Sequence, residues 1–314
     1  MKQSKVAVCM SGGVDSSITA LLLKEKYSVT GVFARFFPEA KGEENARKVC
    51  DTLGIPFQVL DLQKEFKDKV IKSLLQGLKK GITPNPCVFC NKEIKFGELL
   101  RHLSEFDFVA TGHYIRKKDN RLFVAKDKEK DQSYFLWMLD KKEIKKVIFP
   151  LGEYKKSEVR KMASKMNLPV GKESQNFCFG NVSHLIKDSP GKIVNKKGSV
   201  LGEHKGSSFY TTGQRKGLDL PGGPYYVLEK RGSTVIVTKE KKDLYQKEVE
   251  LKDVNIKEEV PLEVEARIRY GSPLKRAVLK KDKLTFLSPQ FAVCSGQSAV
   301  FYRDGELLGG GIIK

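Results

Sequence analysis

Two cysteines three positions apart are the first residues in this sequence that could do chemistry. Cys87 and Cys90 lie in the stretch PNPCVFCNKEIKF, directly after Asn85 and Pro86, where a turn is expected. Thiols with this spacing are typical of a redox pair or of part of a metal site, and they also occur as two unrelated buried thiols. The rest of the chain has to distinguish these interpretations.

A glycine-rich turn near the N-terminus predicts a phosphate site. The run KVAVCMSGGVDSS has the pattern of a buried strand, a tight turn and a helix start, so backbone N–H groups and the helix dipole meet at one place. The turn lacks the GxxxxGK[ST] pattern and its lysine, which suits the release of pyrophosphate. Asp15 is expected to accept N–H groups or to help hold Mg2+. A purely structural turn, capped by a serine, is the alternative.

The elements that must position these residues follow an alternating pattern. Apolar runs KVAVCM, VTGVFARFF and FQVLDL alternate with helical patterns, expected from about Ser16 to Lys26, through ENARKVCDTLG to Gly54, and in a longer third stretch. This βαβα order predicts a parallel sheet covered on both faces. The strand FDFVATGHY carries Gly112 and His113 at its end. Ligands of such sheets bind at the carboxyl ends of strands, so both residues are expected to face the glycine turn.

The second half of the chain has a different texture. The last clear helical pattern of the first part is KKSEVRKMASKM. From about His184 the chain consists of short, Gly-rich pieces that favour β-strands. From about Leu251 the pattern is one of β-strands separated by turn residues. We therefore expect three parts: an α/β domain with a parallel, Rossmann-like sheet over 1–185, a small β-rich connecting domain over 186–249, and a C-terminal β-barrel over 250–314.

Composition limits the compartment and the partners. Six cysteines in 314 residues, without a secretory apolar segment, indicate a reducing, cytoplasmic compartment rather than a disulfide scaffold. No apolar run approaches the length of a membrane span. Lys and Arg outnumber Asp and Glu by 58 to 38, which favours a polyanion as partner, nucleic acid first. Three of the cysteines are expected to be inert core thiols: Cys9, Cys50 and Cys294.

Several stretches, in order along the whole chain, resemble one known family. They are MSGGVDSS, TPNPCVFCNKEIKFG, ATGHY, KDQSYFL, SQNFCF, YTTGQRKGL, RIRYG and GQSAVFY. The first resembles the loop of the ATP pyrophosphatases, which adenylate an oxygen and release pyrophosphate. This resemblance implies a Rossmann-like ATP pyrophosphatase fold for residues 1–185. The full set resembles the tRNA-specific 2-thiouridylases. The resemblance implies sulfur transfer to C2 of the wobble uridine of tRNA, with ATP and Mg2+ as cofactors and with tRNA, not DNA, as the nucleic acid.

The resemblance also implies a role for individual residues. ATP would be held by Cys9, Met10, Ser11, Gly12, Gly13, Val14, Asp15 and Ser16, together with Ala34 and Gly112. The target base would be met by Asn85, Pro86 and Cys87, and the rest of the tRNA by His113, Lys130, Asp131, Gln132, Arg269, Tyr270 and Gln297. Cys90 would be the catalytic thiol. Cys178 would carry persulfide sulfur received from a cysteine desulfurase or a sulfur carrier protein, and a Cys90–Cys178 disulfide would close as the sulfur is released.

The chemistry agrees with these residue types. Replacing a carbonyl oxygen of uracil by sulfur requires that the oxygen become a leaving group, which adenylation supplies, and that a soft nucleophile attack, which a thiolate or persulfide supplies. Neighbouring cations such as Lys92 or Lys95 could lower the pKa of the thiol. A base in a folded tRNA loop must be splayed out to reach such a pocket, and a basic surface suits holding the RNA around it.

The sequence departs from the family at Cys87, where many members have an aspartate. Cys87, Cys90 and Cys178 together resemble the three-cysteine set that holds a [4Fe–4S] cluster with one open iron in related tRNA thiolation enzymes. A persulfide relay without metal and an iron–sulfur route therefore both stay open. Zinc is a weaker alternative, because a structural site has four ligands and His184 has no motif-like spacing from the thiols.

Two functions of other classes remain as rivals. Another ATP pyrophosphatase reaction, such as amidation of a small acid by ammonia, requires the same glycine turn but no reactive cysteine. A non-catalytic tRNA-binding protein with a structural CxxC would bind tRNA without forming AMP. Neither rival accounts for the glycine turn and the three cysteines together.

Overall fold

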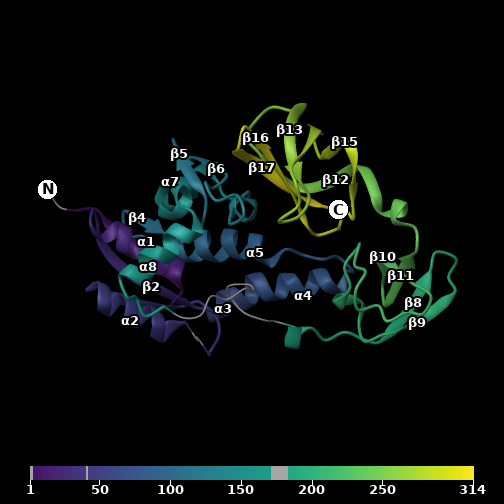
Figure 1. Ribbon diagram of the computed structural model, residues 1–314, viewed down its shortest axis with the longest axis horizontal. Coiled ribbons are helices and arrows are strands. Elements are labelled where there is room, and N and C mark those ends of the chain that lie inside the picture. Colours follow the sequence, from purple (N-terminus) through teal and green to yellow (C-terminus); the bar gives the residue numbers. More distant parts are fainter. Residues whose placement is uncertain (1–2, 40–41, 171–182) are drawn as a thin grey trace. The chain divides into compact units, whose positions relative to one another are not determined.

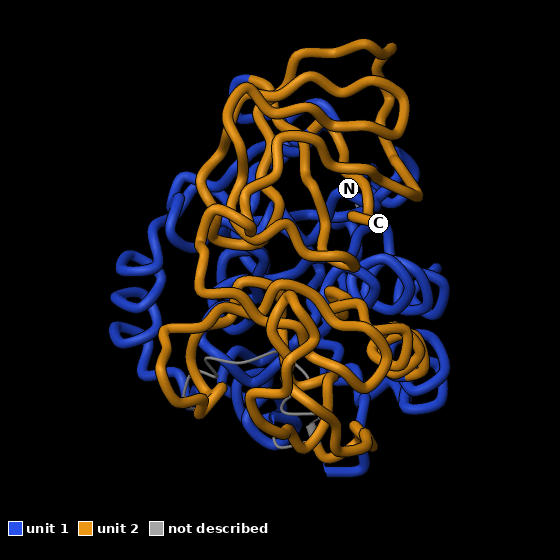
Figure 2. The backbone as a smooth tube through the Cα atoms, turned by 90° about the vertical axis from the view of Figure 1, so that its right-hand side faces the viewer, with its two compact units in different colours: residues 1–71, 87–181, 304–307 blue, residues 72–86, 182–303, 308–314 orange. Residues whose placement is uncertain are grey.

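The computed structural model describes residues 3–39, 42–170 and 183–314. The chain forms two compact units (Figure 2). The first comprises residues 1–71, 87–181 and 304–307, and the second comprises residues 72–86, 182–303 and 308–314, in both cases as far as they are described. Both units are therefore built from segments that are distant in sequence.

A five-stranded sheet with parallel pairing lies at the centre of the first unit, in the order β3-β2-β1-β4-β7 (Figure 1). The strands are β1 (Lys5–Met10), β2 (Ser28–Arg35), β3 (Phe57–Asp61), β4 (Phe108–Ala110) and β7 (Val147–Ile148). Consecutive residues Val6, Ala7 and Val8 of β1 are all fully buried, so both faces of the central strand are covered. The predicted parallel α/β domain is confirmed, although the strand expected over FDFVATGHY is shorter.

Three helices share one core cluster with this sheet: α1 (Val14–Lys24), α2 (Glu43–Leu53) and α8 (Lys156–Lys165). α2 ends where the sequence predicts, because Gly54 adopts the left-handed conformation that terminates helices (φ +65°). α1 begins earlier than the expected Ser16, because Gly13 rather than a serine occupies the N-cap position. The helix start is thus moved directly against the glycine turn.

The helix that carries the cysteine pair begins at Pro86, not after a turn that includes Cys87. It runs as α5 (Pro86–Phe89), a π-helical segment (Cys90–Glu98) and α6 (Leu99–His102). Proline is favoured in the first turn of a helix, where its missing N–H has no intrahelical partner, which explains why the expected Asn-Pro-Cys turn is a helix start. The longer helical stretch after β3 is also divided by a π-helical segment: it consists of α3 (Gln63–Phe66), the π-helical residues Lys67–Ile71 and α4 (Lys72–Lys79).

A second core cluster of the first unit lies around the π-helical segment and α7 (Lys141–Lys146), and it includes Phe96, Ile115 and Phe149. α7 starts at a capping box: the Asp140 side chain accepts hydrogen bonds from backbone N–H groups of the first turn, and the Glu143 side chain accepts one from the backbone N–H of Asp140. The hairpin of β5 (Arg116–Lys118) and β6 (Arg121–Phe123) borders this cluster.

The second unit contains two β-structures. A four-stranded sheet has the order β10-β11-β8-β9 and consists of β8 (Gly191–Asn195), β9 (Val200–His204), β10 (Tyr226–Arg231) and β11 (Thr234–Thr238). The remaining strands are β12 (Tyr245–Ile256), β13 (Leu262–Arg267), β14 (Lys275–Lys280), β15 (Lys283–Phe291), β16 (Ser298–Arg303) and β17 (Glu306–Ile313). They follow the order β12-β15-β14-β13-β16-β17, and β17 pairs with β12, which closes the predicted barrel around its own core.

Short 3-10 helices complete the described chain, at Ser133–Phe135, Pro150–Glu153, Ser183–Leu185, Ser207–Phe209 and Lys241–Leu244. Among the helices of residues 3–39, 42–170 and 183–314, none has the length and apolar character required to cross a bilayer.

Candidate active site

The glycine turn between β1 and α1 is fixed by its own polar groups. Ser16 Oγ accepts the backbone N–H of Ser11 at 3.1 Å and donates to the carbonyl oxygen of Gly13 at 3.0 Å. Gly12 has φ +74°, and a Cβ atom there would collide with the carbonyl oxygen of Gly42. The turn therefore requires glycine at this position and has a defined shape without a ligand.

The N-terminus of α1 has the properties of an anion site. Its first N–H groups, from Val14 to Ser16, lack partners within the helix, as at every helix start. Gly13, the N-cap residue, has no side chain that could accept them. The helix dipole adds a partial positive charge at the same place, so a phosphate group would be stabilised there.

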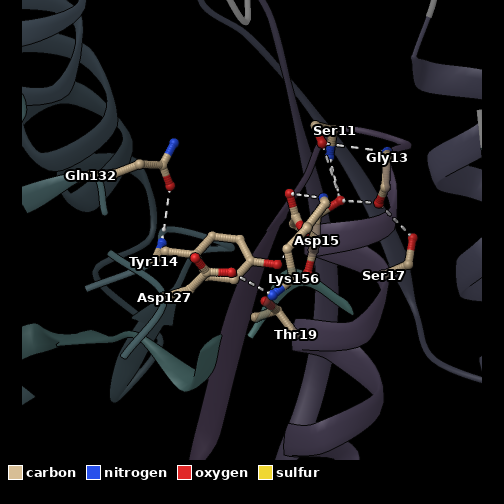
Figure 3. A network of polar contacts seen from close by, with 10 residues as sticks. Ser11, Gly13, Asp15, Ser17, Thr19, Tyr114, Asp127, Gln132 and Lys156 are labelled. Carbon is tan, nitrogen blue, oxygen red and sulfur yellow. Dashed lines mark hydrogen bonds and ion pairs between the residues drawn. The ribbon is translucent and has the colours of Figure 1, made fainter. Parts of the chain in front are cut away.

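Asp15 lies beside this anion site and is held by two side chains that are distant in sequence. Lys156 Nζ donates to both carboxylate oxygens of Asp15, at 2.7 and 2.9 Å, and Tyr114 Oη donates to Oδ1 at 2.8 Å. Figure 3 shows both side chains directed at the Asp15 carboxylate. The Lys156 ammonium also lies 5.9 Å from the centre of the Tyr114 ring. The three side chains form one polar cluster on the first turn of α1.

One short segment holds both partners of Asp15. Gln132 Oε1 accepts the backbone N–H of Tyr114 at 2.9 Å, and the backbone N–H of Gln132 donates to the Tyr114 carbonyl at 3.0 Å. Asp127 Oδ2 accepts the backbone N–H of Lys156 at 2.8 Å (Figure 3). The segment 127–132 is thereby tied to the cluster at two points.

In the stretch Lys130-Asp131-Gln132, the first side chain is exposed and the other two form hydrogen bonds within the protein. Lys130 is exposed. Asp131 is 3% exposed, and its carboxylate accepts the backbone N–H of Ala125 at 3.0 Å, the backbone N–H of Ser133 at 3.3 Å and the Ser133 hydroxyl at 2.8 Å. Asp131 thus shapes the segment that presents Lys130.

Two further residues expected at the nucleotide lie at the same edge of the sheet. A Cβ atom on Gly112 would come within 3.1 Å of the backbone nitrogen of Ser16, so the strand end packs directly against the start of α1. Ala34 is in the last part of β2, where Phe33 is paired with Met10 of β1. The carboxyl ends of β1, β2 and β4 therefore meet around the glycine turn, as the sequence predicts.

The cysteine pair lies on the helix of the first unit that begins at Pro86. Cys87 is half-buried in α5, and Cys90, 1% exposed, begins the π-helical segment. Neither forms a disulfide with another cysteine of the described residues. Cys178 lies outside the described residues, and within the described ones no group of three His, Cys, Asp or Glu residues is placed to bind a metal ion. The structure thus locates two of the three thiols.

Of the two lysines expected to activate a thiol, Lys92 forms an ion pair with a carboxylate. Lys92 Nζ is 2.8 Å from each carboxylate oxygen of Glu143 on α7. The charge of Lys95 lowers the pKa of Cys9, but burial has the larger, opposite effect and raises the pKa of Cys9 to about 12. Burial, and secondarily the charge of Asp51, raises the pKa of Cys50 to about 11. Both thiols stay protonated near neutral pH, as expected for inert cysteines.

His113, which the resemblance assigns to tRNA, lies in the core. It is 8% exposed, its Nδ1 is 2.8 Å from Thr111 Oγ1, and its ring packs against those of Phe96 and Phe149, with centroid distances of 5.9 and 6.3 Å. Burial, followed by the charge of Lys95, lowers its pKa well below the usual value. His113 is therefore a neutral side chain that shapes the end of β4.

The second unit carries the remaining residues expected to contact RNA. Arg269 and Tyr270 are exposed between β13 and β14, and Tyr270 is 45% exposed. Gln297 is half-buried and donates through Nε2 to the carbonyl oxygen of Thr83 at 2.8 Å. Asn85 is 7% exposed. Of these, the pair on the β13–β14 turn is the most accessible to a partner.

Sequence reasoning missed Tyr114 and Lys156. Tyr114 directly follows the expected strand end, but nothing in its sequence neighbourhood indicates that its hydroxyl reaches Asp15. Lys156 opens a helix whose lysine-rich sequence has the pattern of a solvated face. Contacts between residues 141 positions apart, as between Asp15 and Lys156, become visible only in the folded chain.

Three family models match consecutive parts of the chain. They are described as a tRNA methyl transferase HUP domain, matching residues 4–181, a tRNA methyl transferase PRC-barrel domain, matching residues 181–238, and an aminomethyltransferase beta-barrel domain, matching residues 241–313.

Curated relatives match over the full length. The tRNA-specific 2-thiouridylase MnmA of Thermus thermophilus is 42% identical, with 99% of this chain and 95% of the relative covered. The tRNA-specific 2-thiouridylase MnmA 2 of Clostridium botulinum (strain Langeland) is 39% identical, with 100% and 99% covered. The protein of the same name from Thermoanaerobacter sp. (strain X514) is 40% identical, with 99% and 98% covered.

Proposed function

Because this chain belongs to the tRNA-specific 2-thiouridylase family, we propose that it replaces the C2 oxygen of the wobble uridine of tRNA by sulfur, at the expense of ATP. One observation carries the proposal: the pre-shaped anion site at the start of α1 and the cysteine helix that begins at Pro86 belong largely to the same compact unit. The net charge of +20 suits the RNA substrate.

The first step uses the glycine turn. The C2 oxygen of uridine attacks the α-phosphorus of ATP, pyrophosphate leaves, and the oxygen becomes part of an adenylate that can depart as AMP. The N–H groups at the start of α1 stabilise the phosphate charge. Mg2+ would enter with ATP, and Asp15 is the carboxylate of the cluster that fits it, because Mg2+ is usually bound by one or two carboxylates, by phosphates and by water.

The second step uses the thiols. In the relay form of the proposal, the terminal sulfur of a Cys178 persulfide attacks C2, and AMP leaves. The Cys90 thiolate then attacks the Cys178 sulfur, which breaks the S–S bond to the nucleotide, leaves 2-thiouridine and forms a Cys90–Cys178 disulfide. A thiol reductant restores both cysteines, and a cysteine desulfurase or a sulfur carrier protein reloads Cys178.

An iron–sulfur cluster on Cys87, Cys90 and Cys178 is the alternative route for the sulfur. The described residues supply two thiols, Cys87 and Cys90, on one continuous helix. Because a third ligand is not among them, we assign no step to a cluster. Iron and acid-labile sulfide in anaerobically purified protein would decide between the routes: iron that is lost in Cys87→Ser supports the cluster, and iron-free protein that still thiolates supports the relay.

The function is tested with unmodified tRNA, ATP and a sulfide source, by following AMP formation and 2-thiouridine retardation on an organomercury gel. We expect tRNA-dependent AMP from the wild type and no thiolated tRNA from Cys90→Ser. Cys294→Ser is the matched control, because Cys294 is a buried thiol of the barrel. tRNA binding without AMP would support the binding-protein rival, and AMP formation that requires ammonia instead of tRNA would support the amidating rival.

A further inference from the structure

The nucleotide loop contains no lysine, yet the fold brings one to it. Residues 11–17 read SGGVDSS, so the charge that other phosphate loops carry in the loop itself is missing. Lys156, the first residue of α8, reaches the first turn of α1 and contacts both carboxylate oxygens of Asp15. Its side chain is only 10% exposed. A buried ammonium group thus lies beside the anion site.

The base of the Lys156 side chain is fixed by its surroundings. Asp127 accepts the backbone N–H of Lys156, and Glu158 accepts the backbone N–H of Lys155 at 2.6 Å, which anchors the start of α8. The ammonium is held further by Asp15 and by the ring face of Tyr114 (Figure 3). A lysine held in place loses little conformational entropy when it binds a ligand.

The charge balance requires such a cation. A lone Asp15 carboxylate on the first turn of α1 would repel the phosphate groups that the turn and the helix N-terminus otherwise attract. Lys156 offsets this charge at a distance of 2.7 Å. When pyrophosphate begins to leave, the negative charge on its bridging oxygen increases, and an ammonium in a site with little solvent stabilises that charge most.

We propose that Lys156 binds the β- and γ-phosphates of ATP and stabilises the leaving pyrophosphate, so that α8 supplies the cation that the glycine turn lacks. The inference rests on the proposed use of ATP, and it adds a second role for Lys156 beyond holding Asp15. AMP, which has no β- or γ-phosphate, would not make this contact.

The test compares the affinities of Lys156→Met, Lys156→Arg and wild-type protein for ATP and for AMP, by calorimetry on the full chain. Loss of a charge-assisted contact should weaken ATP binding by about tenfold or more, whereas AMP, which meets only the unpaired charge of Asp15, should lose clearly less affinity. Arginine, which keeps the charge, should restore part of the difference. Lys161→Met is the matched control, since Lys161 is an exposed lysine of the same helix. Melting temperatures identify any variant that fails to fold.

A double variant separates the phosphate contact from a purely structural ion pair. If Lys156 only neutralises Asp15, then adding Lys156→Met to Asp15→Asn should leave the ATP affinity of Asp15→Asn unchanged. If Lys156 binds phosphate, the double variant should stay about tenfold weaker than Asp15→Asn alone. Equal ATP affinity of the double variant and Asp15→Asn, or equal loss of ATP and AMP affinity in Lys156→Met, overturns the inference. Wild-type protein that binds no ATP would instead overturn the proposed function.

Discussion

Gln297 on the barrel holds the chain two residues before Asn85. Its Nε2 donates to the Thr83 carbonyl oxygen at 2.8 Å, and the Thr83 N–H donates to the Ser295 carbonyl oxygen at 2.8 Å. Gly296 has φ +89°, and a Cβ atom there would lie 2.9 Å from the Thr83 carbonyl carbon. A residue that the family resemblance assigns to tRNA thus also positions the segment that leads to the cysteine helix.

Replacing Gln297 by alanine should loosen that segment. One lost hydrogen bond corresponds to about 1 kcal/mol of unfolding free energy. We expect faster amide hydrogen exchange in peptides that cover residues 80–86. Gln290→Ala is the control, because the Gln290 amide bonds only locally, to the Ser288 carbonyl at 2.6 Å. Equal exchange in the two variants would show that the Gln297–Thr83 bond does not hold the segment.

Alanine substitutions of the neighbouring residues Lys130 and Asp131 should affect different properties, tRNA binding in the first case and stability in the second. Lys130→Ala removes an exposed charge, so tRNA affinity should fall and the dependence of log K on log salt should decrease by about one unit, with an unchanged melting temperature. Asp131→Ala leaves buried N–H groups unpaired and should cost about 3 kcal/mol of unfolding free energy. Salt titrations and urea unfolding measure both. Asp131→Ala protein with wild-type stability would refute the structural role.

His113 should add a pH dependence to stability. Burial lowers its pKa in the folded chain, whereas the unfolded chain takes up a proton near pH 6.5. Below that pH the unfolded state binds more protons, so unfolding free energy should decrease as pH falls, by at most about 1.4 kcal/mol per pH unit. His113→Gln should remove this part of the slope, and the two curves should run parallel above pH 7.5. A slope below pH 6.5 that is the same in both proteins would contradict the prediction.

Cys9 and Cys50 should resist alkylation. Their raised pKa values, about 12 and about 11, leave little thiolate at pH 8. A short iodoacetamide pulse followed by peptide mass spectrometry should label half-buried Cys87 before Cys9 and Cys50, which should stay unlabelled. The same pulse in urea supplies the control, because all thiols should then react. Labelling of Cys9 at the rate of Cys87 in the native protein would show that its thiol is not suppressed.

The sequence predicts those parts of the fold that are governed by local pattern. The alternation of apolar runs and helices indicated the parallel sheet, and Gly54 marked the end of α2. The β-rich second half and the barrel followed from short strands separated by turn residues. These features depend on hydrophobic periodicity and backbone preferences, which a single sequence contains.

Other features depend on contacts between distant residues and were not predicted. The pairing of Asp15 with Lys156 and Tyr114 is one such feature. The packing of the His113 ring against Phe96 and Phe149 likewise depends on distant residues. The π-helical segment Cys90–Glu98 has no simple sequence signature, because helix propensities do not distinguish the i→i+4 hydrogen bonds of an α-helix from the i→i+5 bonds of a π-helix.

The short run Asp304–Leu307 has a consequence for how this protein can be divided. It belongs to the first compact unit, although the residues before and after it belong to the second. There Gly305 accepts the N–H of Val124, Glu306 pairs with Phe123, and Leu307 packs on the core cluster around Phe96. A fragment ending before residue 304 would lack a piece of the first compact unit. A single cut in the gene therefore does not separate the two compact units into independent modules.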